Sequence, residues 1–359
     1  MKSNIGFLVP GFPADENDST CIPPLQLFIK HFAESYSDFN LFVVAFQYPF
    51  KRGSYKWNNI PVYSAGGKGR GGFFRLLTWL WVIYFFVRIQ MKTKVKGVHS
   101  FWMSECALIG NILSKVFRIP HINSLMGQDV KASNRYLRYV NKNNLRITSV
   151  SLYAAEIFNH SVNHKVDEII PFGIDENHIA HSIDKREIDI IGVGSLIQLK
   201  NFTTFIEIVD ELVKEIKNFQ AVVIGDGVLK PQLQNCVKEK NLENYIRFTG
   251  QLPREEVLKY MLKSKILLHT SLFESQGYVF LEGLKCGLDV VCFDVGFLPA
   301  SKKIHICEDK TVMINTTKSL LKKELDYTSE TPFTTSETVS RFYELYSNSG
   351  FIKNGKRLR

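Results

Sequence analysis

Short apolar runs alternate with amphipathic helical patterns along nearly the whole chain, and this alternation limits the possible folds more than any other feature. Such alternation is typical of α/β proteins, in which helices cover both faces of a parallel sheet. In the first half we expect strands at residues 5–9, 41–45, 97–99, 121–124 and 147–150, and helices at 24–35, 74–91, 105–117 and 151–159. In the second half we expect strands at 188–193, 221–224, 246–249, 266–269 and 289–293, and helices at 202–218, 230–240, 254–263 and 278–286.

The chain of 359 residues is too long for one hydrophobic core, which predicts two domains. Pro171, Gly173 and a polar stretch interrupt the pattern near the middle. We therefore predict a first domain at 1–172, a second at 173–335, and a helix with a basic tail at 336–359 that packs back on the first domain. The predicted fold is two Rossmann-like, doubly wound parallel-sheet domains facing each other across a cleft, where ligands bind at the carboxyl ends of the strands.

The N-terminal segment and the cysteines favour a cytoplasmic location. The first apolar run ends in Pro10-Gly11 without a small-residue cleavage site, so we interpret it as a strand and not as a signal peptide. The six cysteines are scattered and form no CxxC pair, which argues against a disulfide framework or a zinc site.

Charge is distributed unevenly along the chain. The formal net charge is +10, the first 180 residues hold 20 basic and 12 acidic residues, and no acid occurs between Asp38 and Glu105. This asymmetry predicts an anionic partner for the first half: a membrane, a nucleic acid or a phosphorylated ligand. No recognition-helix or aromatic-platform motif accompanies the charge, which disfavours a nucleic acid.

Residues 71–96 form an apolar, aromatic segment flanked by cations. Its uninterrupted apolar core at 76–87 has twelve residues, fewer than the ~20 that a membrane-spanning helix needs. A buried helix is one interpretation. We favour a helix with one face on the core and the other on a lipid surface, with Arg75, Trp79, Arg88 and Lys92 at that surface.

The segment ESQGYVFLEG carries the strongest chemical signal. Gly277 opens a predicted helix whose first N–H groups, at Gly277, Tyr278 and Val279, favour an anion. Glu282 on this helix can accept hydrogen bonds from ribose hydroxyls, and Glu274 in the preceding loop can hold another polyol. A helix start between two carboxylates suits a nucleotide-sugar. A weaker signal for phosphate binding is Gly192-x-Gly194 after a strand, followed by Lys200. The glycines let a phosphate approach the backbone, and the lysine adds a point charge.

Glu274 and Glu282 form a Glu-x7-Glu motif, which is preceded by Gly192, Gly194 and Lys200. Through these motifs, residues 165–296 resemble the donor domain of retaining glycosyltransferases of the GT-B fold, family 4 (glycosyl transferases group 1). The resemblance implies residue roles on both sides of the cleft. It implies catalytic roles for Glu274, Lys200 and His99, and an acceptor side at Gly127 and Asp129. It implies that the donor is bound by Gly194, Ser195, Lys200, Gln276, Gly277, Tyr278, Val279 and Glu282.

The resemblance also implies a reaction. A sugar would pass from a nucleotide-diphosphate sugar to a hydroxyl of a glycan or lipid-linked glycan, with retained anomeric configuration and without a metal or other cofactor. Such an enzyme would serve cell-envelope polysaccharide or glycolipid synthesis, peripherally on the inner face of the cytoplasmic membrane. The sequence departs from the family pattern at Ser195, where an Arg is usual, and at Phe101 and Met126, where His is common.

Two alternatives remain open on the same residues. A sugar-nucleotide epimerase of this fold would also bind a nucleotide-sugar between two such domains. A non-catalytic nucleotide-sugar-binding homologue is favoured by the departures at Ser195, Phe101 and Met126.

Overall fold

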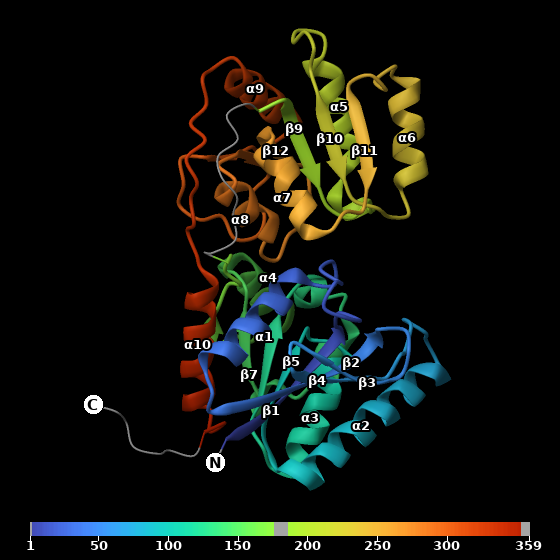
Figure 1. Cartoon of the computed structure of the whole chain (residues 1–359), viewed down its shortest axis with the longest axis vertical. Coiled ribbons are helices and arrows are strands. Elements are labelled where there is room, and N and C mark those ends of the chain that lie inside the picture. Colours follow the sequence, from blue (N-terminus) through green and yellow to red (C-terminus); the bar gives the residue numbers. More distant parts are fainter. Residues whose placement is uncertain (1, 176–185, 353–359) are drawn as a thin grey trace, which may run out of the picture. The chain divides into compact units, whose positions relative to one another are not determined.

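The computed structural model describes residues 2–175 and 186–352, in two units (Figure 1). Unit 1 comprises Met1–Gly173 together with Thr335–Arg359, and unit 2 comprises Ile174–Thr334. The boundaries expected from the sequence, after residues 172 and 335, each lie one residue from this division. The C-terminal helix α10 (Thr335–Asn348) belongs to unit 1 although it follows unit 2 in the chain.

Unit 1 is built on an eight-stranded sheet with the order β3-β4-β2-β1-β5-β6-β7-β8. Only the β3–β4 pair is antiparallel among the described strands of this sheet. The strands are β1 (Ser3–Gly11), β2 (Phe39–Tyr48), β3 (Gly53–Trp57), β4 (Ile60–Ser64), β5 (Val95–Phe101), β6 (His121–Leu125), β7 (Arg146–Ser149) and β8 (Glu168–Ile169). The α-helices are α1 (Pro23–Ser35), α2 (Phe73–Thr93), α3 (Glu105–Phe117), α4 (Leu152–Val162) and α10.

The two faces of this sheet bury different clusters, because successive side chains of a strand point to opposite faces. Leu8 of β1 joins a buried cluster with residues of α2 and α3. Its neighbour Phe7 lies on the other face, with its ring centroid 6.0 Å from that of Phe28 in α1. That second face is aromatic: Phe342 of α10 lies 4.8 Å from Phe28, and both rings are fully buried.

Unit 2 is built on a six-stranded parallel sheet with the order β11-β10-β9-β12-β13-β14. The strands are β9 (Ile188–Val193), β10 (Ala221–Ile224), β11 (Ile246–Gly250), β12 (Ser264–His269), β13 (Asp289–Cys292) and β14 (Ile304–Ile306). The α-helices are α5 (Phe202–Leu212), α6 (Lys230–Glu239), α7 (Arg254–Leu262), α8 (Tyr278–Lys285) and α9 (Lys310–Leu321).

Adjacent residues on the strands of unit 2 enter two separate cores. Ile190 and Leu268 pack with α5, α6 and α9, whereas Ile191 and Leu267 pack with α7 and α8. Helices therefore cover both faces of the sheet, and the predicted α/β class with doubly wound parallel sheets is confirmed.

The structure also contains elements that the sequence pattern did not predict. The β3–β4 hairpin adds an antiparallel edge to a sheet that was expected to be wholly parallel. Helix α9 was not predicted, and α5 ends at Leu212 instead of 218, before a turn in which Asn218 takes a left-handed conformation (φ 58°). Helix α2 spans 21 residues and extends beyond the predicted 74–91 at both ends.

The aromatic contact between α10 and α1 predicts a measurable stability difference. Phe342→Ala should lower the free energy of unfolding by about 3–5 kcal/mol, because it leaves a cavity among fully buried rings. Glu344→Ala, an exposed position on the same helix, should change it by less than about 0.5 kcal/mol. Urea unfolding measures both, and equal effects would contradict the described packing of α10 in unit 1.

Candidate functional site

The candidate site lies at the carboxyl edge of the unit 2 sheet, between β9 and β12. From β9 the chain proceeds to β10 and β11 on one side, and then returns to β12 on the other side of β9. Ligands of open α/β sheets bind at such a reversal of strand order. Lys200 follows β9 and Glu274 follows β12, so the two sequence motifs meet at this point.

Glycines allow the loops after β9 and β10 to run in direct backbone contact. A Cβ on Gly225 would lie 1.9 Å from the carbonyl oxygen of Gly194, and the N–H of Leu196 donates to the Asp226 carbonyl at 2.9 Å. Gly192 has a different role from the predicted one, because its Cβ would clash with the rings of Phe202 and Phe205 on α5. Gly192 therefore serves helix–strand packing, while Gly194 and the exposed Ser195 lie in the loop at the site.

Glu274 is the best-connected charged group of the site. Its Oε1 atom forms an ion pair with Nζ of Lys200 and lies 2.8 Å from Nε2 of His269, the last residue of β12. The three side chains are largely removed from solvent, with 21% exposure for Lys200, 13% for Glu274 and 4% for His269. Lys200 and Glu274 were both predicted from their motifs, but His269 was not. Its position five residues before Glu274 was the available signal in the sequence.

The charge states of this cluster follow from its geometry. Burial alone would raise the pKa of Glu274, but the His269 hydrogen bond and the Lys200 charge outweigh it and lower that pKa to about 2. Burial lowers the pKa of His269, although the bond to Glu274 opposes this shift. An ionised carboxylate can only accept, so a neutral His269 donates its Nε2–H to Glu274.

The second carboxylate, Glu282, is also paired with a cation. Its Oε1 accepts from Nε of Arg254, at the start of α7, at 2.9 Å, and the two side chains are 11% and 14% exposed. The Arg254 guanidinium also lies over the ring of Tyr278, 5.8 Å from its centroid. Arg254 is a second site residue that the sequence analysis did not identify, because it comes from a separate helix.

The start of α8 is fixed by its own glycine and by a neighbouring loop. Gly277 takes the left-handed conformation (φ 72°), and a Cβ there would clash with the ring of Phe280. The carbonyl of the buried Gln276 accepts from the N–H of Phe297 at 2.7 Å. The half-buried Val279 lies in the first turn of α8. The eight predicted donor-binding residues therefore lie in two loops and one helix start of unit 2.

His99 was predicted to be catalytic, and the structure contradicts this. His99 is fully buried on β5 of unit 1, where Nδ1 lies 2.7 Å from the Tyr346 hydroxyl and Nε2 lies 2.8 Å from the Ser124 hydroxyl. Burial lowers its pKa well below the usual value. A histidine whose ring nitrogens both bond to core side chains cannot contact a substrate; it ties α10 to the sheet.

Asp129, predicted on the acceptor side, organises a loop of unit 1. Its carboxylate accepts backbone N–H groups of Gly127 at 2.6 Å and Met103 at 2.7 Å. Burial nevertheless raises the pKa of Asp129 to about 6. Gly127 lies beside Trp102, since a Cβ on it would be 3.2 Å from the indole nitrogen. These contacts assign a supporting role to Asp129 and leave acceptor contact by Gly127 a prediction.

The four residues predicted at a membrane surface all lie on α2. Arg88 and Lys92 are exposed, and Arg75 is half-buried. Trp79 differs from the prediction, because its indole N–H donates to Glu105 Oε2 of α3 at 2.6 Å and its ring is therefore turned toward the protein. Helix α2 has the length and apolar composition of a membrane-spanning helix. Of an 18-residue apolar stretch of this helix, 28% is buried inside the protein.

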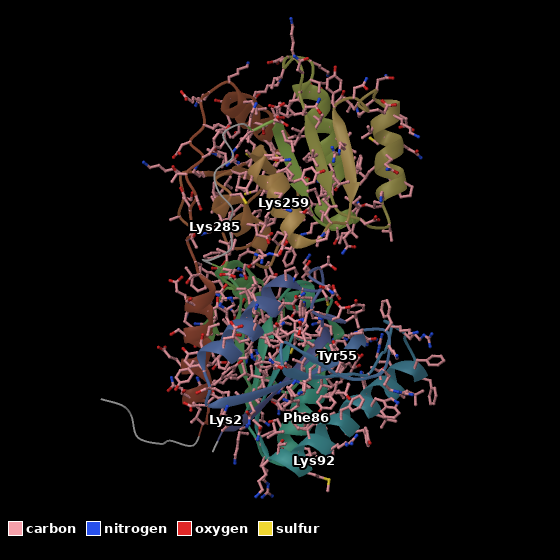
Figure 2. The ribbon with its side chains drawn as sticks, viewed as in Figure 1. Lys2, Tyr55, Phe86, Lys92, Lys259 and Lys285 are labelled. Atoms are coloured by element: carbon pink, nitrogen blue, oxygen red, sulfur yellow. The ribbon has the colours of Figure 1, made fainter. Side chains whose placement is uncertain are left out.

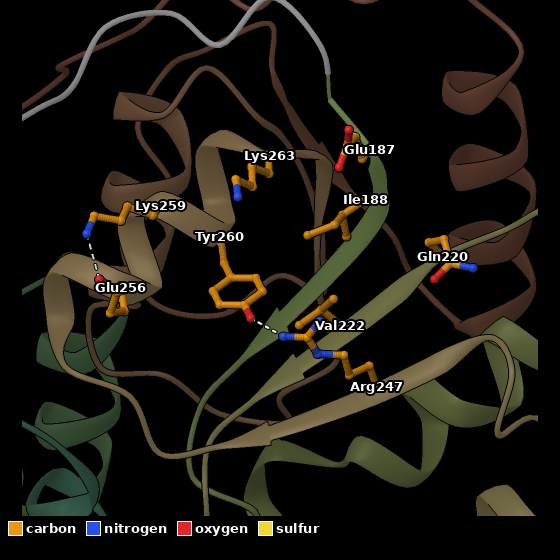
Figure 3. A pocket seen from close by; sticks show the side chains of 9 residues that line it. All are labelled: Glu187, Ile188, Gln220, Val222, Arg247, Glu256, Lys259, Tyr260 and Lys263. Carbon is orange, nitrogen blue, oxygen red and sulfur yellow. Dashed lines mark hydrogen bonds and ion pairs between the residues drawn. The ribbon is translucent and has the colours of Figure 1, made fainter.

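A separate cavity of about 620 Å³ lies at the opposite, amino-terminal ends of β9, β10 and β11 (Figure 3). Figure 3 shows the Tyr260 hydroxyl facing the Arg247 guanidinium at its centre. Bound ligands of this fold class lie at the carboxyl ends, so we assign this cavity no function. Within residues 2–175 and 186–352, no group of three or more His, Cys, Asp or Glu side chains is arranged to hold a metal ion.

Comparison with known proteins identifies relatives of this arrangement. The family model of glycosyl transferases group 1 matches residues 173–306. An uncharacterized glycosyltransferase of Methanocaldococcus jannaschii is 27% identical over 207 residues, 56% of each chain. The N-acetylgalactosamine-N,N'-diacetylbacillosaminyl-diphospho-undecaprenol 4-alpha-N-acetylgalactosaminyltransferase of Campylobacter jejuni is 33% identical over 140 residues, 38% of this chain and 37% of that protein. These matches thus span about half, or less, of the relatives' lengths.

Solved structures match nearly the whole chain. A sucrose-phosphate synthase from Thermosynechococcus elongatus superposes with a TM-score of 0.75 at 14% identity, covering 97% of this chain and 99% of that one. The Anabaena protein HepE in complex with UDP-glucose superposes with a TM-score of 0.66 at 16% identity, covering 96% and 99%. At such low identity these matches concern the fold alone. The chain therefore has the fold of GT-B glycosyltransferases, and its second half resembles the glycosyl transferases group 1 family.

Proposed function

We propose that this protein is a retaining glycosyltransferase that transfers a sugar from a nucleotide-diphosphate sugar to a hydroxyl of a glycan or lipid-linked glycan. The observation that carries the proposal is the pair of cation-bound carboxylates, Glu274 with Lys200 and Glu282 with Arg254, on either side of the start of α8. The family match over residues 173–306 supports it, because that match contains both carboxylates and Lys200.

In the proposed complex the diphosphate contacts Lys200 and the backbone N–H groups at the start of α8. A helix start carries partial positive charge and donors directed along its axis, which suits a phosphate. Glu282, oriented by Arg254, accepts from the ribose hydroxyls. Glu274, oriented by His269, accepts from hydroxyls of the transferred sugar.

The chemical step in this proposal is the departure of the diphosphate. The bond between the anomeric carbon and the diphosphate oxygen breaks, and its electron pair stays on that oxygen, where Lys200 and the α8 start stabilise the charge. The acceptor hydroxyl then bonds to the anomeric carbon on the face that the diphosphate left, and its proton passes to the leaving diphosphate. Configuration is thereby retained without a protein nucleophile, and the site supplies orientation and charge stabilisation.

The acceptor class is proposed from the relatives. The name of the Campylobacter jejuni relative describes a transferase that acts on a saccharide of diphospho-undecaprenol. A glycan or lipid-linked glycan acceptor, within cell-envelope polysaccharide or glycolipid synthesis, is the corresponding proposal for this chain.

A donor screen tests the proposed function. Purified protein is incubated with UDP-, GDP- and dTDP-sugars and a glycan or lipid-linked glycan acceptor, and the anomeric configuration of the glycoside product is read by NMR. Transfer with retained configuration is expected from one donor. An inverted product, or an epimerised nucleotide-sugar without transfer, would contradict the proposal.

Glu282 variants give the sharpest residue test. Glu282→Gln should raise the KM for the donor by about 10–100-fold, because it loses charge-assisted hydrogen bonds worth about 1.5–3 kcal/mol. Glu282→Ala should do at least as much, but it also removes the ion-pair partner of the largely buried Arg254, so folding must be checked by circular dichroism. Glu255→Gln, an exposed control on α7, should match the wild type. Wild-type kinetics in both Glu282 variants would refute the assigned role.

We also propose that no metal takes part in the reaction, because Lys200 and the α8 start supply the positive charge at the diphosphate. The initial rate should therefore be the same in EDTA as in untreated buffer. A loss of activity in EDTA that Mg²⁺ or Mn²⁺ restores would show that a metal is required.

The Glu274 cluster predicts a pH-dependent stability difference. The pKa of Glu274 in the folded protein is about 2, below its ordinary value of 4.5, so the ionised carboxylate stabilises the fold above pH 4.5 and this contribution is lost as the pH falls through 2. Glu274→Gln should cost about 3 kcal/mol at pH 7 and clearly less at pH 3. Urea unfolding at both pH values measures this, with Glu256→Gln as the exposed control. A cost independent of pH would show that the Glu274 charge is not the cause.

A further inference from the structure

Helix α2 presents an apolar stripe on the side that faces away from unit 1. Five of its side chains are 37–82% exposed, and Val87 is half-buried. The stripe consists of Phe73, Leu77, Leu80, Tyr84, Val87 and Met91. Spacings of three and four residues place all six on one side of a helix. The stripe runs from the first turn to the last, a length of about 27 Å at ~1.5 Å per residue.

The opposite side of α2 is fixed in the core of unit 1. Val82 and Phe86 are fully buried, in a cluster with Val44 of β2 and Ile109 of α3. Figure 2 labels Phe86 inside unit 1 and Lys92 near the end of α2. To span a membrane, α2 would have to leave this cluster and expose it. The helix is therefore apolar on two sides, one of them covered by its own domain.

The segment that contains α2 is rich in cations and has no acidic residue. Residues 39–104 contain ten Lys and Arg residues and no Asp or Glu. Among the described residues, none of these ten cations forms an ion pair. Two lie over aromatic rings: Arg52 is 4.0 Å from the Trp81 centroid, and Arg70 is 5.3 Å from that of Phe74.

Glu105, which contacts Trp79 of α2, does not neutralise this surface. Glu105 is 8% exposed, and its carboxylate accepts from the side chains of Gln47 and Trp79. Its charge is thus turned into the protein. The surface around α2 combines apolar side chains with unpaired positive charge over the whole length of the helix.

We infer that α2 docks unit 1 on an anionic phospholipid bilayer, with the helix lying in the plane of the interface. The apolar stripe enters the acyl boundary, and the surrounding cations meet the lipid phosphates. This inference does not rest on the proposed enzymatic function. A second copy of the chain fits the charges poorly. Antiparallel pairing of two α2 helices sets Arg75 of one against Arg88 and Lys92 of the other, parallel pairing sets Arg88 against Arg88, and neither segment supplies an acid.

Vesicle co-sedimentation tests the inference with the full chain. Binding is measured to phosphatidylcholine vesicles with and without phosphatidylglycerol. The wild type should bind the anionic vesicles, and less so as salt rises. Leu80→Gln should weaken this binding about tenfold or more, because it removes one buried apolar side chain. Arg88→Gln with Lys92→Gln should weaken it by about fivefold for each charge.

Matched controls separate docking from general effects of polarity and charge. Val228→Gln changes an apolar residue of unit 2 that is 84% exposed, and Lys217→Gln with Lys238→Gln removes two exposed unit 2 charges. All three substitutions should leave binding unchanged. Equal weakening by the controls, or equal binding to neutral vesicles, would overturn the inference. So would a dimer in solution that Leu80→Gln dissociates, or membrane-bound protein that alkaline carbonate fails to release.

Discussion

Burial of the Glu274 carboxylate is the constraint on which the candidate site depends. A carboxylate removed from water is costly unless charges and donors compensate it. Lys200 and His269 provide that compensation from the loop after β9 and the end of β12. The two can reach one carboxylate only because β9 and β12 are neighbours at the reversal of strand order. The strand order of unit 2 therefore determines which charged side chains meet at its site. Glu282 and Arg254 form a second, largely buried ion pair there.

Site residues whose spacing is local could be predicted from the sequence, whereas residues whose role depends on tertiary contacts could not. The separation of Glu274 from Glu282 is set by one loop and one helix turn, so it was visible in the sequence. Arg254 was not, because its approach to Glu282 depends on how α7 packs beside α8. The family resemblance implied a catalytic role for His99, but the pleat turns its side chain toward Tyr346 of α10. The sequence contains no local sign of that contact with a distant helix.

The two units differ in whether their positively charged side chains are paired with carboxylates. In unit 2 the cations at the site are paired with carboxylates, which orients both partners for a ligand. In unit 1 the cations around α2 have no such partners among the described residues, and they border an apolar stripe. The positively charged side chains of the two units therefore have different proposed partners. In the proposed function a nucleotide uses the positive charge of unit 2, and the positive charge of unit 1 remains for the anionic bilayer that we infer as its partner.

A crystal structure with an unhydrolysable UDP-sugar, or with the nucleotide diphosphate of the preferred donor, tests the central claim most directly. The account predicts the diphosphate within hydrogen-bond distance of the Lys200 Nζ and the first N–H groups of α8, with ribose hydroxyls on Glu282 and the Arg254 pair intact. A nucleotide bound elsewhere, for example in the cavity at the amino-terminal ends of β9–β11, or a diphosphate without contact to Lys200, would contradict it.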